Sequence, residues 1–459
     1  MCGGDQRAGR GDAPPLRGRR PPARRRAALH AGVLGRPARR PAAHGPGHAA
    51  AGHAPTTGPE RPAPGLSPWV LRIATVGLVL AALNLRPAIT SLGPLLEEVR
   101  DGLHMSGSIA GVLTSVPPLC FALFGFMAPR LARRFGPSAV VCAGMAAIAA
   151  GLLLRPFVGG TAGFLAASAL ALMGIAVSNV LMPVIVKRWF PDRVGTMTGL
   201  YSMALALGTA LAAALTVPLT DALGGSWRTG LVIWAALAVV AVVPWVPFLK
   251  DRGDATGQTA GATAPPALKI TRSRTSWALA CFFGLQATAA YITMGWMPQI
   301  FRDAGLSAGT SGVLLAVIMA MGVPLAFVIP RVATRLPAQG PIVLVLSGCG
   351  LLGYAGLYVA PAGGAWLWAL LLGIANCAFP LALTMIGMRS RTGAGVVRLS
   401  AFAQSTGYLI SIPGPLLVGV LYQHSGGWGL PLALMAALLV PQTIAGVLAG
   451  RDRKIEDEC

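Results

Sequence analysis

Residues 162–186 read AGFLAASALALMGIAVSNVLMPVIV, a run without any charged side chain, and Lys187 and Arg188 follow it directly. A helix that crosses the hydrocarbon core of a bilayer needs roughly 20 mostly apolar residues, so this run is long enough to span a membrane. Similar runs recur along the chain between charged or Gly/Pro clusters, and we count twelve. The twelve predicted spans are residues 70–95, 106–128, 138–157, 162–186, 196–219, 229–249, 277–299, 309–329, 341–360, 366–388, 398–421 and 428–449.

The composition of the whole chain agrees with these spans. Of its 459 residues 54% are hydrophobic and 11% are charged, whereas a soluble domain carries about 25% charged residues. Only helices and closed barrels satisfy their backbone groups inside lipid, and barrel strands would give short alternating segments instead of long apolar runs. We therefore predict an all-α membrane protein with twelve transmembrane helices.

The first 66 residues differ from the rest. They are rich in Arg, Pro, Gly and Ala, and twelve Arg against three acids supply +9 of the net charge of +22. They lack an apolar run long enough for a signal peptide, so we expect residues 1–66 to be disordered. Two interpretations stay open: a basic tail that touches anionic lipid, or an extension upstream of the natural start that the native protein lacks. Neither interpretation needs a nucleic-acid partner, and we expect none.

The loops between the spans show a strong charge asymmetry. One side of the predicted membrane carries nineteen Lys and Arg, and the other side carries four. Cytoplasmic loops are enriched in Lys and Arg, so we predict a multi-pass protein of the cell inner membrane with both termini in the cytoplasm.

The two halves of the chain repeat one another at an offset of about 200 residues. Arg100–Leu103 reappears as Arg302–Leu306, and the loop Pro129–Arg134 reappears as Pro330–Arg335. Parallel six-helix repeats imply a pseudo-two-fold axis along the membrane normal, with a substrate held between the halves near the midplane. Alternating access by rocking of the halves follows from that geometry.

The repeat sets the predicted domain organisation. After the extension at 1–66 we place a six-helix bundle at 67–249, a cytoplasmic linker at 250–276, a second six-helix bundle at 277–450 and a cytoplasmic tail at 451–459. The linker is rich in Gly, Ala, Thr and Pro, as a flexible tether between two bundles should be.

One loop of the first half carries a family signature. Pro129–Gly136 is similar to the Gly-x-Leu-Ala-Asp-Arg-x-Gly loop of the major facilitator superfamily, with Pro129 in place of the first Gly and Arg133 in place of the Asp. The resemblance extends from about residue 70 to residue 450. It implies the superfamily's fold, in which two pseudo-symmetric six-helix bundles form a secondary transporter.

Two further segments indicate a branch of that superfamily. Asn84–Ser91 followed by Gly93–Leu96, together with Gln404, Tyr408 and Gly414–Leu417, resembles the cyanate/nitroimidazole transporter (CynX/NimT) branch. A cyanate-like or nitroimidazole-like substrate and a co-transported proton are what this resemblance implies. It also implies that basic loop residues latch the bundles in the outward-facing state, although a role in topology alone is an equal alternative; these are Arg130, Arg133, Arg134, Arg331 and Arg335.

Arg86 is the leading candidate for substrate binding. It lies about sixteen residues after Val70, in the middle of the first span, and a charge in lipid costs several kcal/mol unless it faces a polar cavity. A guanidinium offers a planar fork of donors that suits small oxyanions and carboxylates. The alternative is an Arg that is satisfied by helix carbonyls and by Asn84 or Ser91, and that only stiffens the break at Pro87.

Other polar side chains lie at midplane depth in the predicted spans. They are candidates for hydrogen bonding to a substrate, but in membranes such groups serve equally as contacts between helices. The substrate-binding candidates beside Arg86 are Asn84, Asn179, Gln286, Tyr291, Asn376, Gln404 and Tyr408.

The sequence lacks the motifs of other function classes. We find no Walker loop, no HExxH and no GxSxG, and we predict no catalytic residue, no metal site, no cofactor and no enzyme activity.

The prediction is secondary active transport of a small anionic or nitrogen-containing solute across the lipid bilayer, by a monomer. Export of drugs or metabolites by the same fold stays the alternative, because Gly414–Gly419 is similar to an element of drug/proton antiporters. A non-transporting receptor is less favoured, since it would normally add a folded signalling domain.

Overall fold

A computed structural model describes residues 68–249 and 269–458 of the chain. The predictions for residues 1–66 and for most of the linker at 250–276 lie outside these ranges. All described residues belong to one compact unit, Pro64–Cys459. We refer to residues 68–249 as the N-half and to residues 269–458 as the C-half.

The described chain is helical, and twelve of its helical segments are long and apolar enough to cross a membrane. They match the twelve predicted spans one to one, which confirms the predicted fold class. The N-half contains α1 (Pro68–Asn84), α2 (Pro87–Thr90), α3 (Leu96–Leu103), α4 (Gly107–Phe135), α5 (Pro137–Leu154), α6 (Gly160–Trp189), α7 (Val194–Ala222) and α8 (Trp227–Val242), with short 3₁₀ turns at Gly93–Leu95, Pro191–Arg193 and Val243–Phe248.

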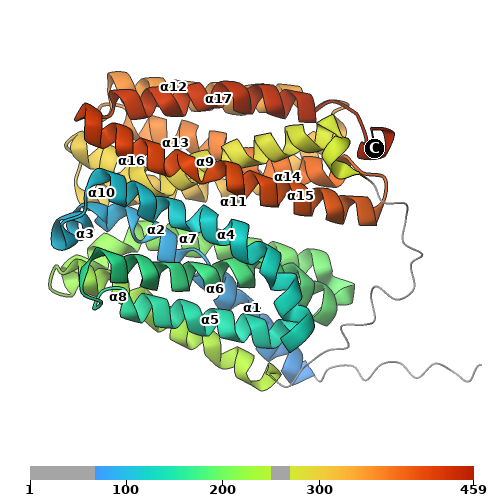
Figure 1. The fold of residues 1–459 in the computed structure, drawn as a ribbon, viewed down its shortest axis with the longest axis horizontal. Coiled ribbons are helices and arrows are strands. Elements are labelled where there is room, and N and C mark those ends of the chain that lie inside the picture. Colours follow the sequence, from blue (N-terminus) through green and yellow to red (C-terminus); the bar gives the residue numbers. More distant parts are fainter. Residues whose placement is uncertain (1–67, 250–268, 459) are drawn as a thin grey trace, which may run out of the picture. The chain divides into compact units, whose positions relative to one another are not determined.

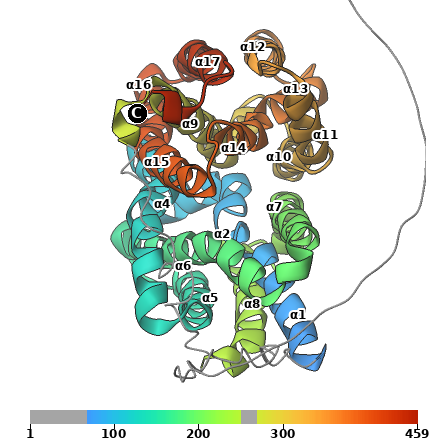
Figure 2. The same ribbon diagram turned by 90° about the vertical axis from the view of Figure 1, so that its right-hand side faces the viewer.

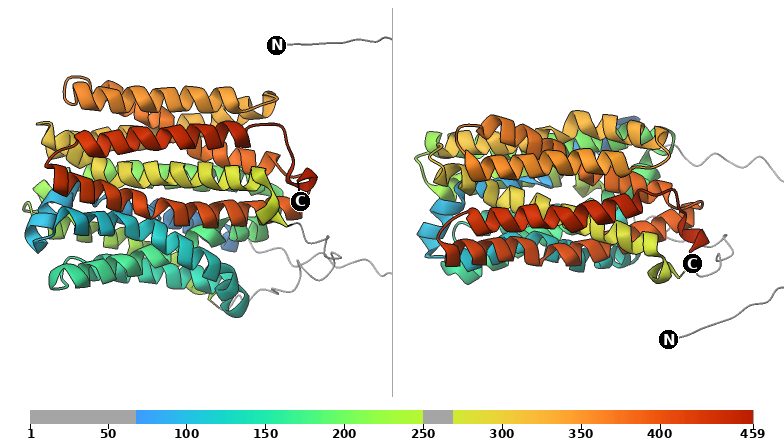
Figure 3. Two further views of the ribbon diagram at one scale, coloured as in Figure 1. Left: turned by 45° about the horizontal axis from the view of Figure 1, so that its top comes forward. Right: turned by 90° about the horizontal axis from the view of Figure 1, so that it is seen from above.

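The C-half has the same number of spans, although several are broken. It contains α9 (Arg274–Asp303), α10 (Ala308–Ala320), α11 (Gly322–Arg335), α12 (Gly340–Val359), α13 (Ala365–Asn376), α14 (Ala378–Met388), α15 (Gly393–Ser411), α16 (Pro413–Ser425) and α17 (Gly429–Ala449), with 3₁₀ turns at Ile270–Arg272 and Ile455–Asp457. Figure 1 shows the N-half below the C-half, and Figure 3 shows that the long helices of both halves run along a common direction.

The first span breaks where the sequence predicts it. Pro87 has no N–H and disfavours helical backbone at the residue before it. Arg86 accordingly leaves the helical region (φ −123°, ψ −27°) and becomes the N-cap of α2, where its carbonyl accepts from Ile89 and Thr90. The guanidinium is thereby attached at a break in the backbone.

The halves meet along three helix pairs that Figure 2 shows from one end of the bundle: α4 with α15, α4 with α16, and α7 with α10. Glycines allow the closest approach. A Cβ on Gly419 of α16 would lie 2.5 Å from the Gly107 carbonyl oxygen of α4, and one on Gly312 of α10 would lie 2.6 Å from the Ala213 carbonyl oxygen of α7. Backbone therefore touches backbone across the interface, as small residues permit in membrane helices.

Polar contacts between the halves gather at one end of the bundle, which we call the Glu97 end. Arg302, the penultimate residue of α9, reaches Glu97 and Glu98 of α3 at 2.9 Å each and also donates to the Pro94 carbonyl. Nearby, the Gln423 side chain of α16 accepts two hydrogen bonds of 2.8 Å from the backbone N–H and the hydroxyl of Ser108 of α4. These contacts hold the Glu97 end shut.

The opposite end, which we call the Arg130 end, carries the basic loops. All five loop arginines named above are exposed, and no carboxylate of residues 68–249 or 269–458 forms an ion pair with them. Their expected latching role is therefore not engaged in this conformation.

The C-terminal tail also lies at the Arg130 end, where it binds the C-half. Glu458 accepts hydrogen bonds from the Ser273 hydroxyl (2.7 Å) and from the backbone and hydroxyl of Thr275 (2.9 Å each). Asp457 forms a two-pronged ion pair with Arg391. The tail thus ties the start of α9 to the loop between α14 and α15.

Candidate functional site

Arg86 lies between the halves, half-buried, and faces aromatic hydroxyl groups. Its guanidinium lies within electrostatic range of the hydroxyls of Tyr291 of α9, Tyr201 of α7 and Tyr408 of α15. Because the backbone breaks at Pro87, the charged group leaves the helix surface at a point where both halves contribute neighbours.

Aromatic rings surround these hydroxyls. Phe121 of α4 stacks on Tyr408 with ring centroids 5.0 Å apart, and it lies 6.5 Å from the ring of Tyr291. Phe283 packs edge-on against the other side of Tyr408 at 5.2 Å. The Tyr408 ring is therefore fixed between two neighbours.

Asn179 of α6 completes the arrangement by accepting a hydrogen bond from the Tyr201 hydroxyl. We call the group formed by Arg86, Phe121, Asn179, Tyr201, Tyr291 and Tyr408 the central cluster. It has one positive charge and several hydroxyl and amide groups, and no carboxylate of the described chain pairs with Arg86. Such a set can bind a small anion or an electron-rich polar group, since charge-assisted hydrogen bonds from guanidinium are strong in a low dielectric.

Four of the eight predicted site residues thus come together: Arg86, Asn179, Tyr291 and Tyr408. Gln404 lies one helical turn from Tyr408 on α15 and donates to Ser400 at 2.7 Å, so it extends the same helix face toward the Arg130 end.

The other three predicted residues lie elsewhere. Asn84 is fully buried inside the N-half and its amide points to the Met145 sulfur of α5, 4.0 Å away. Gln286 donates to both the backbone and the side-chain oxygen of Asn376, 3.0 Å each, and accepts from Gln442. This network lies within the C-half and joins its own helices, as the alternative interpretation of such groups expects.

Sequence reasoning missed two members of the central cluster. Tyr201 is the sole Tyr before Tyr291 in the chain, and a lone phenol within an apolar span is a signal that could have identified it. Phe121 carries no such signal, because a Phe in a membrane span is ordinary.

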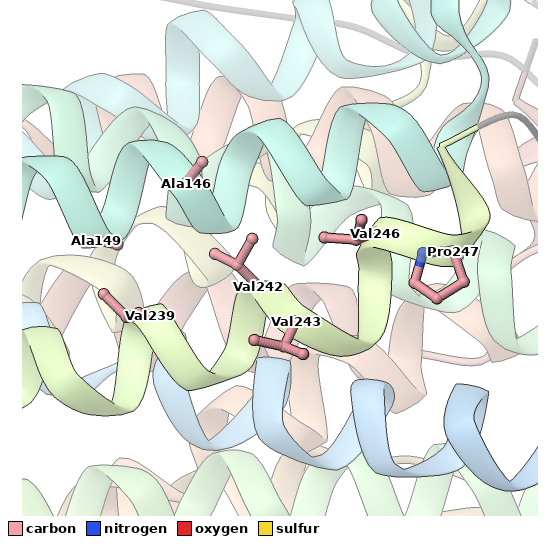
Figure 4. Close-up of a pocket in the computed structure, with 7 residues that line it drawn as sticks. All are labelled: Ala146, Ala149, Val239, Val242, Val243, Val246 and Pro247. Carbon is pink, nitrogen blue, oxygen red and sulfur yellow. The ribbon is translucent and has the colours of Figure 1, made fainter.

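An apolar hollow on the N-half is a different kind of feature. Figure 4 shows it between α5 and the end of α8, lined by Ala146, Ala149, Val239, Val242, Val243, Val246 and Pro247. Its volume is about 600 Å³, but no polar side chain lines it. A polar solute would find no partner there, so we do not assign it to substrate.

Comparison with known proteins gives consistent results. The model of the Major Facilitator Superfamily matches residues 78–393. The chain is 36% identical to the uncharacterized transporter YycB of Bacillus subtilis (strain 168), over 83% of this chain and 94% of that protein. It is 32% identical to the 2-nitroimidazole transporter of Escherichia coli (strain K12), over 83% of this chain and 96% of that protein.

A third relative and a solved structure extend the comparison. The cyanate transport protein CynX of Escherichia coli (strain K12) is 31% identical over 79% of this chain and 93% of that protein. The crystal structure of the nucleoside transporter NupG shares the fold, with a TM-score of 0.67 at 14% identity, and covers 83% of this chain and 98% of that one. The resemblance predicted from the loop and from the Asn84–Ser91 segment is confirmed. The twelve membrane spans, the two six-helix halves and these matches together show that the chain belongs to the major facilitator superfamily of membrane transporters.

Proposed function

We propose that this protein is a secondary active transporter that takes up a small anionic or nitrogen-containing solute, with Arg86 as the binding charge. The observation that carries the proposal is the position of Arg86 between the halves, facing hydroxyls from α7, α9 and α15. A cation without a carboxylate partner at that depth is costly unless something else balances it. A bound anion would supply that balance.

The central cluster is suited to alternating access. Arg86, Phe121, Asn179 and Tyr201 belong to the N-half, whereas Tyr291 and Tyr408 belong to the C-half. A solute held by both sets is released when the halves move apart, because either set alone keeps only part of the contacts. Binding and conformation are thereby coupled.

The charge asymmetry of the loops gives the proposed orientation. It places the Arg130 end and the C-terminal tail in the cytoplasm and the Glu97 end outside. The conformation described here is then closed to the outside, and the loop arginines would pair in the opposite state. Uptake is the proposed direction, and the names of two relatives describe those proteins as transporters of 2-nitroimidazole and of cyanate.

Proton coupling is part of the proposal but needs a proton carrier. The carboxylates nearest the interface between the halves are Glu97 and Glu98, at the end of the bundle, and none belongs to the central cluster. We propose that the proton either uses these residues or accompanies the anion as its conjugate acid. An imposed pH gradient that leaves uptake unchanged would contradict coupling while leaving anion binding intact.

Thermal unfolding of the purified protein tests the binding charge. We would compare wild type, Arg86→Lys and Arg86→Ala against cyanate, nitrate, acetate, 2-nitroimidazole and a lipophilic cation such as tetraphenylphosphonium. We expect an anion or the nitroimidazole to raise the melting temperature of wild type, to act more weakly on Arg86→Lys and to leave Arg86→Ala unchanged, because Lys keeps the charge and loses the planar fork. If only the lipophilic cation stabilises, and does so in all three proteins, drug export is the better function.

A further inference from the structure

A second arginine lies buried close to the central cluster. Arg155 caps the end of α5 and is 2% exposed, less than any other arginine of the described chain except Arg389. One guanidinium nitrogen, Nη1, donates to the Ala88 carbonyl at 3.0 Å, and the group lies 5.6 Å from the ring of Phe164. Its other two nitrogens, Nε and Nη2, have no hydrogen-bond partner. Buried donors are nearly always satisfied, so these two need an explanation.

The explanation lies in a small cavity that Arg155 lines. Ser168 of α6 lines it too, and the Ser168 hydroxyl, 3% exposed, likewise lacks a partner. The third polar side chain from the N-half is Thr114, whose hydroxyl already accepts from Trp296 and donates within α4. With a volume of about 20 Å³, the cavity has room for one water molecule in this conformation. Two unsatisfied groups thus face one small polar space.

Tyr291 connects this cavity to the central cluster. It lines the cavity, and its hydroxyl is within electrostatic range of Arg86. Arg155 lies at the end of α5 that, like α3, points to the Glu97 end, because α5 begins directly after the loop of Arg130. The half-buried Arg86 and the buried Arg155 are therefore arranged one behind the other along the bundle, with Arg155 nearer the Glu97 end.

The wall of the cavity comes mostly from one half. Tyr291 and Gly295 of α9 are the only lining residues from the C-half, and the remainder come from α2, α4, α5 and α6 and the segments between them. The same helix α9 carries Arg302 in its last turn, and the ion pairs of Arg302 join the halves at the Glu97 end. A movement of α9 away from the N-half after these pairs break would remove that wall and open the cavity toward the Glu97 end.

We propose that Arg155 and Ser168 form an outer anion-binding subsite, which receives the solute at the Glu97 end before it reaches Arg86. This inference rests on the proposed function. A guanidinium keeps its charge at any physiological pH, and its free edge and the hydroxyl of Ser168 can donate hydrogen bonds to a small anion. In the closed conformation a water occupies the space and the anion does not.

Transport kinetics measured separately from the two membrane faces test the subsite, with cyanate as the probe. Intact cells or right-side-out vesicles report the KM at the Glu97 end, and inverted vesicles report it at the Arg130 end. We expect Arg155→Gln to raise the KM at the Glu97 end at least tenfold and to leave the other KM within twofold. Arg155→Lys should lie between, and Ser168→Ala should raise the same KM about threefold.

Arg228→Gln is the matched control. Arg228 also lies at the Glu97 end and donates to a backbone carbonyl, that of Pro156, but it does not line the cavity. It should change neither KM by more than twofold. Should Arg155→Gln fail to fold, Ser168→Ala and Arg155→Lys carry the test.

Two outcomes overturn the inference. If the Arg155 and Ser168 variants change both KM values equally, or lower only the melting temperature, Arg155 serves the packing of α5 against α2 and there is no outer subsite. If wild type itself neither binds nor transports cyanate or any other probe anion, the proposed function fails first and the subsite with it, and that failure is visible without any variant.

Discussion

The ion pairs of Arg302 control whether the Glu97 end opens, and their loss has a calculable effect. Arg302→Gln removes the contacts to both Glu97 and Glu98 while keeping a side chain able to donate to the Pro94 carbonyl. Exposed ion pairs contribute about 0–1 kcal/mol, and hydrogen bonds to charged groups contribute about 1.5–3 kcal/mol. The side chain of Arg302 is 18% exposed, but those of Glu97 and Glu98 are 41% and 35% exposed, so solvent weakens both pairs.

For the two pairs together we take about 2 kcal/mol, which corresponds to a roughly 30-fold change in the equilibrium between the open and closed forms of this end. An open population of about 1% would then rise to about one quarter. Glu98→Gln alone should give about 1 kcal/mol, or roughly fivefold.

The assay is a distance measurement between two spin labels, one on each half. Asp101 of α3 and His424 of α16 are both exposed near the Glu97 end and can be replaced by labelled cysteines. Wild type should give mainly one short distance, and Arg302→Gln should add a second, longer one. Arg228→Gln, a charge loss at the same end that leaves the contacts between the halves in place, should resemble wild type.

The result that would refute this reasoning is an unchanged distance distribution in Arg302→Gln. The double variant supplies a second check, because contacting residues are coupled and distant ones are additive. If the effects of Glu98→Gln and Arg302→Gln simply add, the two side chains do not share the contact that closes this end.

Three further predictions concern other parts of the molecule. Tyr291→Phe removes a hydroxyl that lies close to the Arg86 guanidinium and should weaken anion binding about fivefold to tenfold. Ligand-induced shifts in melting temperature would show the weaker binding, and the melting temperature of the free protein should change little. Gly111→Val places side-chain atoms against the backbone of Leu416, since even a Cβ would lie 2.9 Å from the Leu416 carbonyl oxygen. The spin-label distances should therefore shift toward the open form. Gly309→Val, whose side chain meets open space, should leave these distances unchanged. Burial raises the pKa of Glu458, but the hydrogen bonds from Thr275 and Ser273 outweigh this effect and hold the pKa below its usual value. The tail contact therefore stabilises the protein above about pH 4.3, and this stabilisation is lost as the pH falls through the lowered pKa. Glu458→Gln should lower the melting temperature at pH 7 by an amount equivalent to about 1 kcal/mol, and this difference from wild type should vanish in acid.

The sequence predicted the spans and the break at Pro87 because both depend on local properties. Apolar length fixes where a helix can cross lipid, and the missing N–H of proline fixes where it breaks. The direction in which a polar side chain points is a different matter. Asn84 precedes Arg86 by two residues, and residues two apart on a helix do not face each other. The position of Asn84 inside the N-half therefore follows from helix geometry, which a prediction from depth in the membrane alone does not consider.

Depth alone also does not show which neighbours a polar side chain faces. Gln286 and Asn376 lie at the predicted level but bond to each other within the C-half. The spans are apolar on nearly every face, so no polar stripe in the sequence distinguishes the side facing the interface from the side facing a neighbour in the same half. Arg155 is one of the four Lys and Arg that the sequence analysis assigns to loops on the less basic side of the membrane. An Arg at the end of a span normally extends to the membrane surface, whereas Arg155 turns inward to the Ala88 carbonyl.

The construction of the interface explains how one end can be shut and yet open readily. Where α4 meets α16, glycines such as Gly107 and Gly419 let the two backbones approach closely. Closing this contact therefore buries little apolar side-chain surface, and opening it exposes little. The closed end is then held chiefly by a few polar contacts, of which the Arg302 pairs contribute about 2 kcal/mol. A large apolar interface would stabilise one conformation by a large free energy. The difference in a small solute's binding free energy between the two conformations could not outweigh it. With glycine contacts and breakable ion pairs, we expect the two conformations to differ by only a few kcal/mol. The proposed binding of one small anion between Arg86 and the tyrosines could shift an equilibrium within that range.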